Sequence, residues 1–235
     1  MVSFPAYEIY ACGDHAYTLD LGQQINVGTN RFIIRLFKAL QHNKPSFILD
    51  IIPAYSSITI VYDPLALPHE DPEEIIHLCF TDVIHLSALD QSNEHSSVIR
   101  IPVCYHPSVA PDLEALCSKL EMNADSLVSI HTSKPYRVFM NGFLPGFAYM
   151  GSVDHRIAAP RHQSPRKVVP AGSVGIAGSQ TGIYPLDSPG GWQLIGKTTV
   201  TLFDPLSDKP CLLQPGDEVQ FYPISLDEFQ HCKPL

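Results

Sequence analysis

Two arginines, Arg161 and Arg166, carry the clearest chemical signal of the sequence, because each directly follows a proline. A proline fixes the backbone dihedral φ, so Pro160 and Pro165 hold the two guanidinium groups in a restricted loop. A guanidinium group held in this way favours bidentate binding of a carboxylate or phosphate. A solvated basic surface is the alternative interpretation. The spacing predicts an anion site at Arg161 and Arg166.

An aromatic segment precedes the arginines, between Asn141 and Tyr149. Its rings alternate with turn residues, and so short a stretch cannot bury all of them. Rings beside amide groups form the walls of ligand pockets. The predicted ligand-binding residues of this segment are Phe143, Pro145, Gly146, Phe147 and Tyr149.

A third segment, residues 170–196, combines glycine turns with hydrogen-bonding side chains. Its polar groups are Ser179, Gln180, Thr181 and Tyr184. The only tryptophan, Trp192, follows Gly190 and Gly191, and these three are candidate ligand-binding residues, although a lone tryptophan is more often part of a core. The glycines match neither a Walker A loop nor a dinucleotide fingerprint. No ATP cradle is predicted in this chain.

Charge and glycine content set this part of the sequence apart. The window from Gly142 to Gly196 contains ten of the fourteen glycines and has a charge of +2, whereas the whole chain has a formal net charge of -9. Glycine loses the most backbone entropy on folding, so such density indicates either tight turns or close backbone approach at a binding surface. The acidic remainder argues against nucleic acid or an anionic membrane as the main partner.

The chain has 235 residues, of which 45% are hydrophobic, enough for two domains. It shows neither a secretory signal nor an apolar run of the roughly 18 residues that a membrane span needs, so a cytoplasmic protein is expected. Its six cysteines form no Cys-x-x-Cys pair. We predict reduced thiols and no metal site.

The first domain, residues 1–90, is predicted as a two-layer α+β unit of order β-β-α-β-β-α. Apolar alternation and turn residues indicate its strands, which are expected at Tyr7 to Ala11, Ala16 to Leu21, Phe47 to Ile52 and Ser57 to Tyr62. One helix is expected from Asn26 onward and a second from Asp71, which precedes Pro72 at the first helical position. The polar stretch 89–97 is the expected linker.

The second domain, residues 91–235, is predicted as mostly β. Two short helices are expected, one opening at Pro111 and one capped by Asn123. Brief runs punctuated by Gly and Pro suit a closed β-barrel better than a parallel sheet. The expected strands include Val98 to Tyr105, Tyr136 to Met140, Val174 to Ala177, Thr198 to Phe203 and Glu218 to Tyr222.

The same window resembles a known family, that of the B component of 5-oxoprolinase, also called KipI or allophanate hydrolase subunit 1, with carboxyltransferase subdomains C and D. The resemblance spans nearly the whole chain. Its longest matching elements are GF-x-PGF at 142–147, IA-x-PR at 157–161, PAGSVGIAG-x-QTG at 170–182 and SPGGWQLIG at 188–196. In a glycine-rich turn of the family, His106, Pro107 and Ala110 replace three glycines in this chain.

The resemblance implies an N-terminal α+β domain followed by a cyclophilin-like closed β-barrel. It also implies work with a second, KipA-like carboxyltransferase subunit and a third lactam-opening component, which together cleave 5-oxo-L-proline to L-glutamate with ATP bound by the assembled complex. Two alternatives remain open. One is an inhibitor of a sporulation-type histidine kinase, and the other is a carboxyltransferase or allophanate hydrolase subunit for a urea-like substrate.

These elements give a hypothesis for catalysis. Hydrolysis of an unstrained five-membered lactam is unfavourable, so ATP activates the lactam oxygen, and charge develops there. Arg161 and Arg166 are predicted to hold the substrate carboxylate or this charge, while Gln180, Tyr184 and His131 position polar groups. A buried structural histidine is the slightly preferred alternative for His131.

Overall fold

The computed structural model describes residues 6–23, 25–67, 71–89 and 98–232. The chain divides into two compact units, residues 1–95 and 96–235. The predicted linker, 89–97, and the predicted boundary after residue 90 lie outside the described residues, apart from Leu89. Within the described part, no helix is long and apolar enough to cross a membrane.

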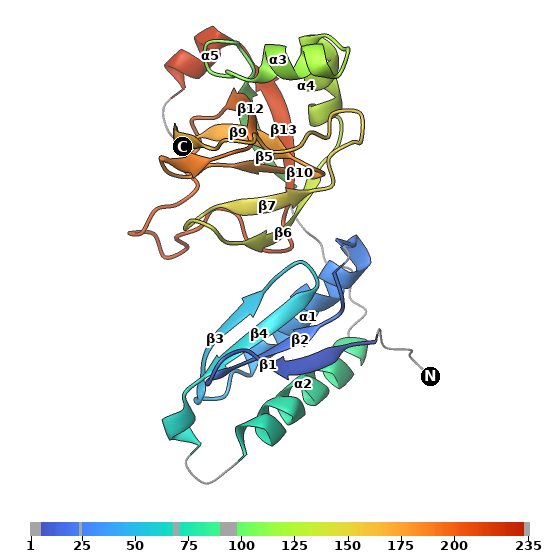
Figure 1. Cartoon of the computed structure of the whole chain (residues 1–235). Coiled ribbons are helices and arrows are strands. Elements are labelled where there is room, and N and C mark those ends of the chain that lie inside the picture. Colours follow the sequence, from blue (N-terminus) through green and yellow to red (C-terminus); the bar gives the residue numbers. More distant parts are fainter. Residues whose placement is uncertain (1–5, 24, 68–70, 90–97, 233–235) are drawn as a thin grey trace. The chain divides into compact units, whose positions relative to one another are not determined.

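The N-terminal unit is an antiparallel sheet of strand order β1-β2-β4-β3, covered on one face by two helices (Figure 1). The strands are β1 Glu8–Ala11, β2 Ala16–Asp20, β3 Ile48–Pro53 and β4 Ser57–Tyr62. The helices are α1 Val27–His42 and α2 Pro72–Leu89, with a short 3-10 turn, η1 Pro64–Ala66, before α2. The predicted two-layer order is confirmed.

Local signals explain helix α1. The side chain of Asn26 accepts hydrogen bonds from the backbone N–H groups of Gly28 and Thr29, which satisfies two of the unpaired donors at the helix start. Ile33 and Leu36 are fully buried on the face that packs against the sheet. The periodicity of the sequence therefore gives this helix both its start and its buried face.

The C-terminal unit contains a closed barrel of strand order β10-β7-β6-β13-β5-β12-β9. Its strands are β5 Val98–Cys104, β6 Tyr136–Asn141, β7 Ala148–Gly151, β9 Ser173–Ala177, β10 Gln180–Ile183, β12 Gln193–Lys197 and β13 Glu218–Ile224. A separate two-stranded sheet pairs β8 Arg166–Val169 with β11 Ser188–Gly190. The helices are α3 Leu113–Lys119, α4 Ala124–Thr132 and α5 Leu226–His231. The predicted closed barrel is confirmed.

One predicted strand is wrong. Residues 198–203 form no strand, and Phe203 makes only an isolated bridge to Cys211. The chain leaves the barrel after Lys197, and the carbonyl oxygen of Leu202 accepts from the N–H of Leu212 in the same excursion. The backbone groups of this segment therefore pair with a neighbouring loop and not with a barrel strand. Strands β7, β8, β10, β11 and β12 and helix α5 have no counterpart among the predicted elements.

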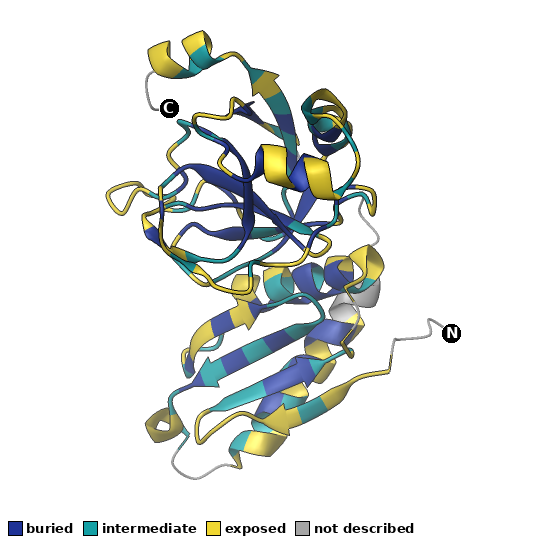
Figure 2. Ribbon diagram, turned by 45° about the horizontal axis from the view of Figure 1, so that its top comes forward, coloured by how far each residue is buried: buried dark blue, intermediate teal, exposed yellow. Residues whose placement is uncertain are grey.

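Side chains alternate between the inside and the outside of the barrel along each strand. On β7, Ala148 and Met150 belong to the barrel core, whereas Tyr149 packs against a second, smaller cluster. On β12, Ile195 lies in the core and Leu194 in the smaller cluster. Figure 2 shows the barrel strands as almost continuously buried, so side chains on both the inner and the outer face of the strands are covered. This alternation decides which candidate residues can meet.

Candidate functional site

Five aromatic side chains from distant parts of the sequence meet on the outer layer of the barrel, and we call them the aromatic cluster. They are Phe143, Phe147, Tyr149, Tyr184 and Trp192. The ring centroid of Phe147 lies 4.8 Å from that of Tyr149, 5.4 Å from that of Tyr184 and 5.5 Å from that of Trp192, all with steep interplanar angles. Edge-to-face packing of this kind is favourable for aromatic rings. The predicted segments therefore meet in one packed cluster, in which Phe147, Tyr184 and Trp192 are buried, as expected for a lone tryptophan in a core.

Two glycines, Gly182 and Gly190, allow the backbone to pack closely against the rings of the aromatic cluster. A Cβ atom added at Gly182 would lie 3.1 Å from Cζ of Phe147 and 3.1 Å from Cζ3 of Trp192. A Cβ added at Gly190 would lie 2.4 Å from the phenolic oxygen of Tyr184. Each backbone segment thus approaches a ring more closely than a side chain would permit. At these two positions, close approach explains the glycine density of the sequence.

Phe143 is the exposed member of the aromatic cluster. It is 58% exposed and adopts a positive φ of 69°, a conformation that is uncommon for residues other than glycine. Its ring still contacts Phe147 edge-on, at a centroid distance of 5.6 Å. Pro145 is exposed and Gly146 is buried in the same loop, with a φ of 81° at Gly146. An exposed ring on a strained backbone is typical of ligand sites.

Arg161 lies above the aromatic cluster and is held by its neighbours in the chain. The carbonyl oxygen of Pro160 accepts from Nε2 of Gln193 at 2.9 Å, and the N–H of His162 donates to the carbonyl oxygen of Gly191 at 2.7 Å. The guanidinium carbon of Arg161 lies 5.9 Å from the ring centroid of Trp192, in a cation–π arrangement. The loop is thus fixed on both sides of an exposed guanidinium group, as its sequence predicts.

Arg166 has a different environment. Its Nη2 atom donates a short hydrogen bond to the carboxylate of Asp112. The same carboxylate accepts from the N–H of Leu194 at 2.7 Å, and Nε2 of His162 lies 3.2 Å from it. The charge of Arg166 is therefore compensated within the chain, which corrects the prediction that both arginines are free to bind an anion.

Asp112 is the residue that the sequence analysis missed. It stands at the start of α3, where an aspartate normally caps the helix, but its side chain makes no capping hydrogen bond. The available signal was its place in the family turn that also contains His106 and Ala110. The N–H of Ala110 donates to the carbonyl oxygen of His106 at 3.0 Å, so this turn closes without the usual glycines and leads directly to Asp112.

The phenol of Tyr184 is influenced by the charges of both arginines. Burial raises the pKa of its phenol, while the backbone N–H of Trp192 and the charges of Arg161 and Arg166 oppose that rise. The phenol is therefore protonated at neutral pH, and its O–H group is a hydrogen-bond donor. Burial also raises the pKa of Tyr149, against the opposing charge of Arg161. Both phenols are therefore protonated, and that of Tyr184 is buried within the aromatic cluster.

Gln180 and Thr181 show how strand alternation divides the predicted residues. Both lie on β10, where Gly182 faces the aromatic cluster. Gln180 is two residues from Gly182 and shares its face, so it points to the outer layer. Thr181 points the other way, into the barrel, where its Oγ1 donates to the carbonyl oxygen of Gly175 at 3.0 Å. Of the two residues, Gln180 alone faces the candidate site.

His131 lies inside the barrel, on the opposite face of β10 from the aromatic cluster. It is fully buried and stacks on Phe221 at a centroid distance of 4.9 Å. Its Nδ1 atom lies 2.8 Å from the hydroxyl of Tyr105, and its Nε2 atom lies 3.0 Å from Oγ1 of Thr181. Because Thr181 donates to a backbone carbonyl, it accepts from Nε2–H, which assigns the neutral tautomer. We therefore favour a structural role for His131, the alternative that its sequence context already slightly favoured.

The burial of His131 predicts a pH dependence of stability. Burial lowers its pKa from 6.5 to about 3. Below the unfolded-state pKa the unfolded chain binds a proton that the folded chain does not. The free energy of unfolding therefore decreases as the pH is lowered from the unfolded-state pKa to the folded-state pKa, by up to about 1.4 kcal/mol per pH unit. Above that window the effect is absent. We expect His131→Gln to remove this part of the slope in urea unfolding between about pH 4 and 6.5 and to leave the curve above that range unchanged.

His155→Gln is the matched control for that measurement, because the side chain of His155 is 93% exposed. This variant should retain the slope of the unsubstituted protein. Parallel stability curves for His131→Gln and the unsubstituted protein would show that His131 is protonated to the same extent in the folded and unfolded states.

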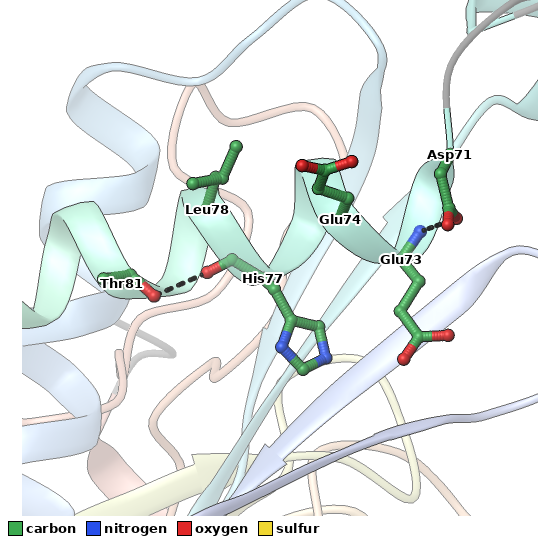
Figure 3. Close-up of a pocket in the computed structure, with 6 residues that line it drawn as sticks. All are labelled: Asp71, Glu73, Glu74, His77, Leu78 and Thr81. Carbon is green, nitrogen blue, oxygen red and sulfur yellow. Dashed lines mark hydrogen bonds between the residues drawn. The ribbon is translucent and has the colours of Figure 1, made fainter.

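A shallow pocket of about 370 Å³ lies at the start of α2 (Figure 3). Its lining residues are Asp71, Glu73, Glu74, His77, Leu78 and Thr81. The carboxylate of Asp71 accepts from the N–H of Glu73 at 3.0 Å, which is a helix-capping contact. No group of three or more His, Cys, Asp or Glu side chains arranged to hold a metal ion occurs in the described ranges. The candidate site is therefore the aromatic cluster with its arginines.

The chain thus combines a small α+β unit with a closed barrel whose outer layer carries an aromatic cluster and a cation. The family described as carboxyltransferase domain, subdomain C and D, matches residues 7–213, and the chain belongs to this family. The B component of the 5-oxoprolinase of Bacillus subtilis (strain 168) is 38% identical over 232 residues, which cover 97% of each chain. The resemblance seen in the sequence is therefore confirmed.

Two longer proteins extend the comparison. The solved structure of TTHA0988 is 35% identical with a TM-score of 0.77, and the match covers 89% of this chain and 40% of that chain. The urea amidolyase of Saccharomyces cerevisiae is 24% identical over 248 residues, which cover 92% of this chain and 13% of that protein. This chain spans under half of each of these two proteins.

Proposed function

We propose that this protein is a subunit of an ATP-dependent 5-oxoprolinase, which cleaves 5-oxo-L-proline to L-glutamate in the cytoplasm. The observation that carries the proposal is Arg161, fixed by hydrogen bonds on both sides and placed over Trp192 without a carboxylate partner among the described residues. The likeness to the B component of a 5-oxoprolinase over 97% of both chains supports it.

The surface suits the chemistry of a small lactam acid. The guanidinium group of Arg161 binds the substrate carboxylate, and the exposed ring of Phe143 packs against the flat ring of the substrate. Charge develops at the lactam oxygen when this oxygen is phosphorylated, and the buried Tyr184 phenol lies beneath the site and supports its rings. ATP supplies that phosphoryl group, and we place its binding in the assembled complex with a KipA-like subunit and a third lactam-opening component.

The reconstituted complex tests the proposal. The purified chain, its second carboxyltransferase-like subunit and the third component are mixed with ATP and 5-oxo-L-proline, and L-glutamate is measured. We expect glutamate only when all components and ATP are present. Full glutamate formation in the absence of this chain would contradict the proposal.

A urea-type reaction is the second candidate, and the likeness to a urea amidolyase favours it. A carboxylated urea is also a small planar anion, so the same guanidinium group and rings suit it. Consumption of urea by the complex in the presence of a biotin-carrying protein would support this candidate. Turnover of 5-oxoproline with no urea consumption would reject it.

A further inference from the structure

The two guanidinium groups beside the aromatic cluster differ in their charge balance. Arg161 has no carboxylate within ion-pair distance in the described part of the chain, whereas Arg166 is bonded to Asp112. The Asp112 side chain is only 8% exposed and is also held by the N–H of Leu194. A buried and doubly bonded carboxylate keeps its position, so the compensation of Arg166 is a fixed property of the fold.

Arg166 nevertheless retains an unused donor. Its Nη1 atom is shielded from solvent and has no hydrogen-bond partner among the described residues, and the same is true of the hydroxyl oxygen of Ser188. In the small sheet of β8 and β11, Arg166 pairs with Gly190, whereas Ser188 pairs with Val169, so the two groups are separate. A buried donor without an acceptor is unfavourable, so an acceptor from outside the chain would complete this arrangement.

The acceptor that fits is uncharged. A second anion placed at Arg166 would also meet the carboxylate of Asp112, and the repulsion cancels the attraction of the guanidinium group. A carbonyl oxygen carries no net charge and accepts a hydrogen bond without this repulsion. We propose that Asp112 is a specificity-determining residue, which reserves Arg166 for a neutral carbonyl oxygen and leaves Arg161 to bind the single carboxylate of the ligand. This inference rests on the function proposed above.

The division of roles favours a lactam with one carboxylate over a dicarboxylate, and it also favours release of the product. In the proposed reaction the phosphoryl group of ATP is transferred to the lactam oxygen, one water adds to the carbonyl carbon, and the bond from that carbon to the ring nitrogen breaks. The nitrogen becomes an ammonium group, and a second water hydrolyses the resulting acyl phosphate and releases inorganic phosphate. The former carbonyl becomes a second carboxylate. That charge develops beside Asp112, so the product is bound more weakly than the substrate.

Inhibition of the assembled complex tests this assignment. Three probes are used: the dicarboxylates L-glutamate and glutarate, and the neutral lactam 2-pyrrolidinone. We expect Asp112→Asn to lower the inhibition constants of both dicarboxylates by about tenfold, because it leaves Arg166 with an uncompensated charge. The constant for 2-pyrrolidinone should stay within about twofold of its original value. Asp154→Asn is the matched control, since Asp154 pairs with Arg156 at an exposed site, and it should change none of the constants.

A second variant guards against misfolding of the first. Arg166→Gln keeps an amide donor but leaves Asp112 uncompensated, so it should raise the constants for both dicarboxylates. Opposite shifts in the two variants support the inference, whereas equal shifts for all three probes in either variant overturn it. If the complex does not turn over 5-oxoproline, the proposed function fails. Binding of the same probes to the chain, measured by calorimetry, still tests whether Asp112 keeps a second anion from Arg166. Absence of binding by every probe overturns the inference on Asp112 as well.

Discussion

Arg161→Ala in the assembled complex is expected to lower kcat/KM for 5-oxo-L-proline by about 10²- to 10³-fold, the range observed when a preorganised charged or polar contact is removed. Arg161 is the one cation of its loop that faces the aromatic cluster without a carboxylate partner in the described part of the chain. Because its backbone is held independently through Pro160 and His162, truncation of the side chain should leave the loop in place. Steady-state kinetics with the three-component complex measure the effect.

Arg156→Ala is the control for this prediction. Arg156 belongs to the same loop, but its guanidinium group pairs with Asp154 at 2.9 Å and its side chain is 57% exposed. Exposed ion pairs contribute little, so the variant should keep its kinetics and its stability. Equal losses of kcat/KM in both variants would point to a general effect of loop charge and would remove Arg161 from the proposed site.

Gly172→Ala is expected to lower the free energy of unfolding by about 3 to 5 kcal/mol, near the upper end of single substitutions. Gly172 has a φ of 81°, which alanine adopts only with strain. An added Cβ would also lie 2.2 Å from the carbonyl oxygen of Thr198, a backbone atom that cannot turn aside. The N–H of Thr198 donates to the carbonyl oxygen of Gly172 at 2.9 Å, so the two segments cannot separate without loss of this bond. Urea unfolding monitored by circular dichroism measures the change.

Gly178→Ala separates the effect of backbone strain from that of the contact with Thr198. Gly178 also has a positive φ, of 59°, but an added Cβ would meet no atom within 4 Å. Backbone strain alone should then lower the free energy of unfolding by about 1 kcal/mol. A comparable loss in both variants would show that the contact with Thr198 relaxes and that backbone strain dominates at both positions.

The sequence was sufficient to predict the residues that form the aromatic surface. Phe143 and Phe147 lie in one short loop, Tyr149 lies on the strand that follows it, and Trp192 follows a glycine turn, so local patterns identified them. The structure brings these residues together and adds Arg161 above Trp192. Proline-restricted loops and turn glycines act over a few residues, which is why their effect can be inferred from the chain alone.

The charge balance of Arg166 could not be inferred in this way. Its partner Asp112 lies 54 residues earlier, at the start of a helix where an aspartate ordinarily has a local capping role. The inner position of His131 was equally hidden, because its bond to Thr181 joins residues 50 positions apart. Both facts depend on which strands become neighbours. Local sequence patterns carry no information on that choice.

The short strands set a further limit. Strands of three or four residues, such as β7, β8 and β11, contain too few positions for alternation to be visible in the sequence. The apolar run at 198–203 has the opposite problem, since it has the composition of a strand but pairs with a loop. The closed barrel was predictable from the many brief runs, whereas its exact members were not.

The bond between His131 and Thr181 has a consequence for the ligand surface on the other side of β10. Side chains on this strand alternate, so a slip of one residue would exchange its two faces. Gly182 would then turn toward the imidazole, and a threonine would collide with the rings of Phe147 and Trp192. The hydrogen bond between the imidazole and Thr181 thus helps to fix the register of β10. The arrangement of residues on the outer face of β10 therefore depends on a hydrogen bond inside the barrel.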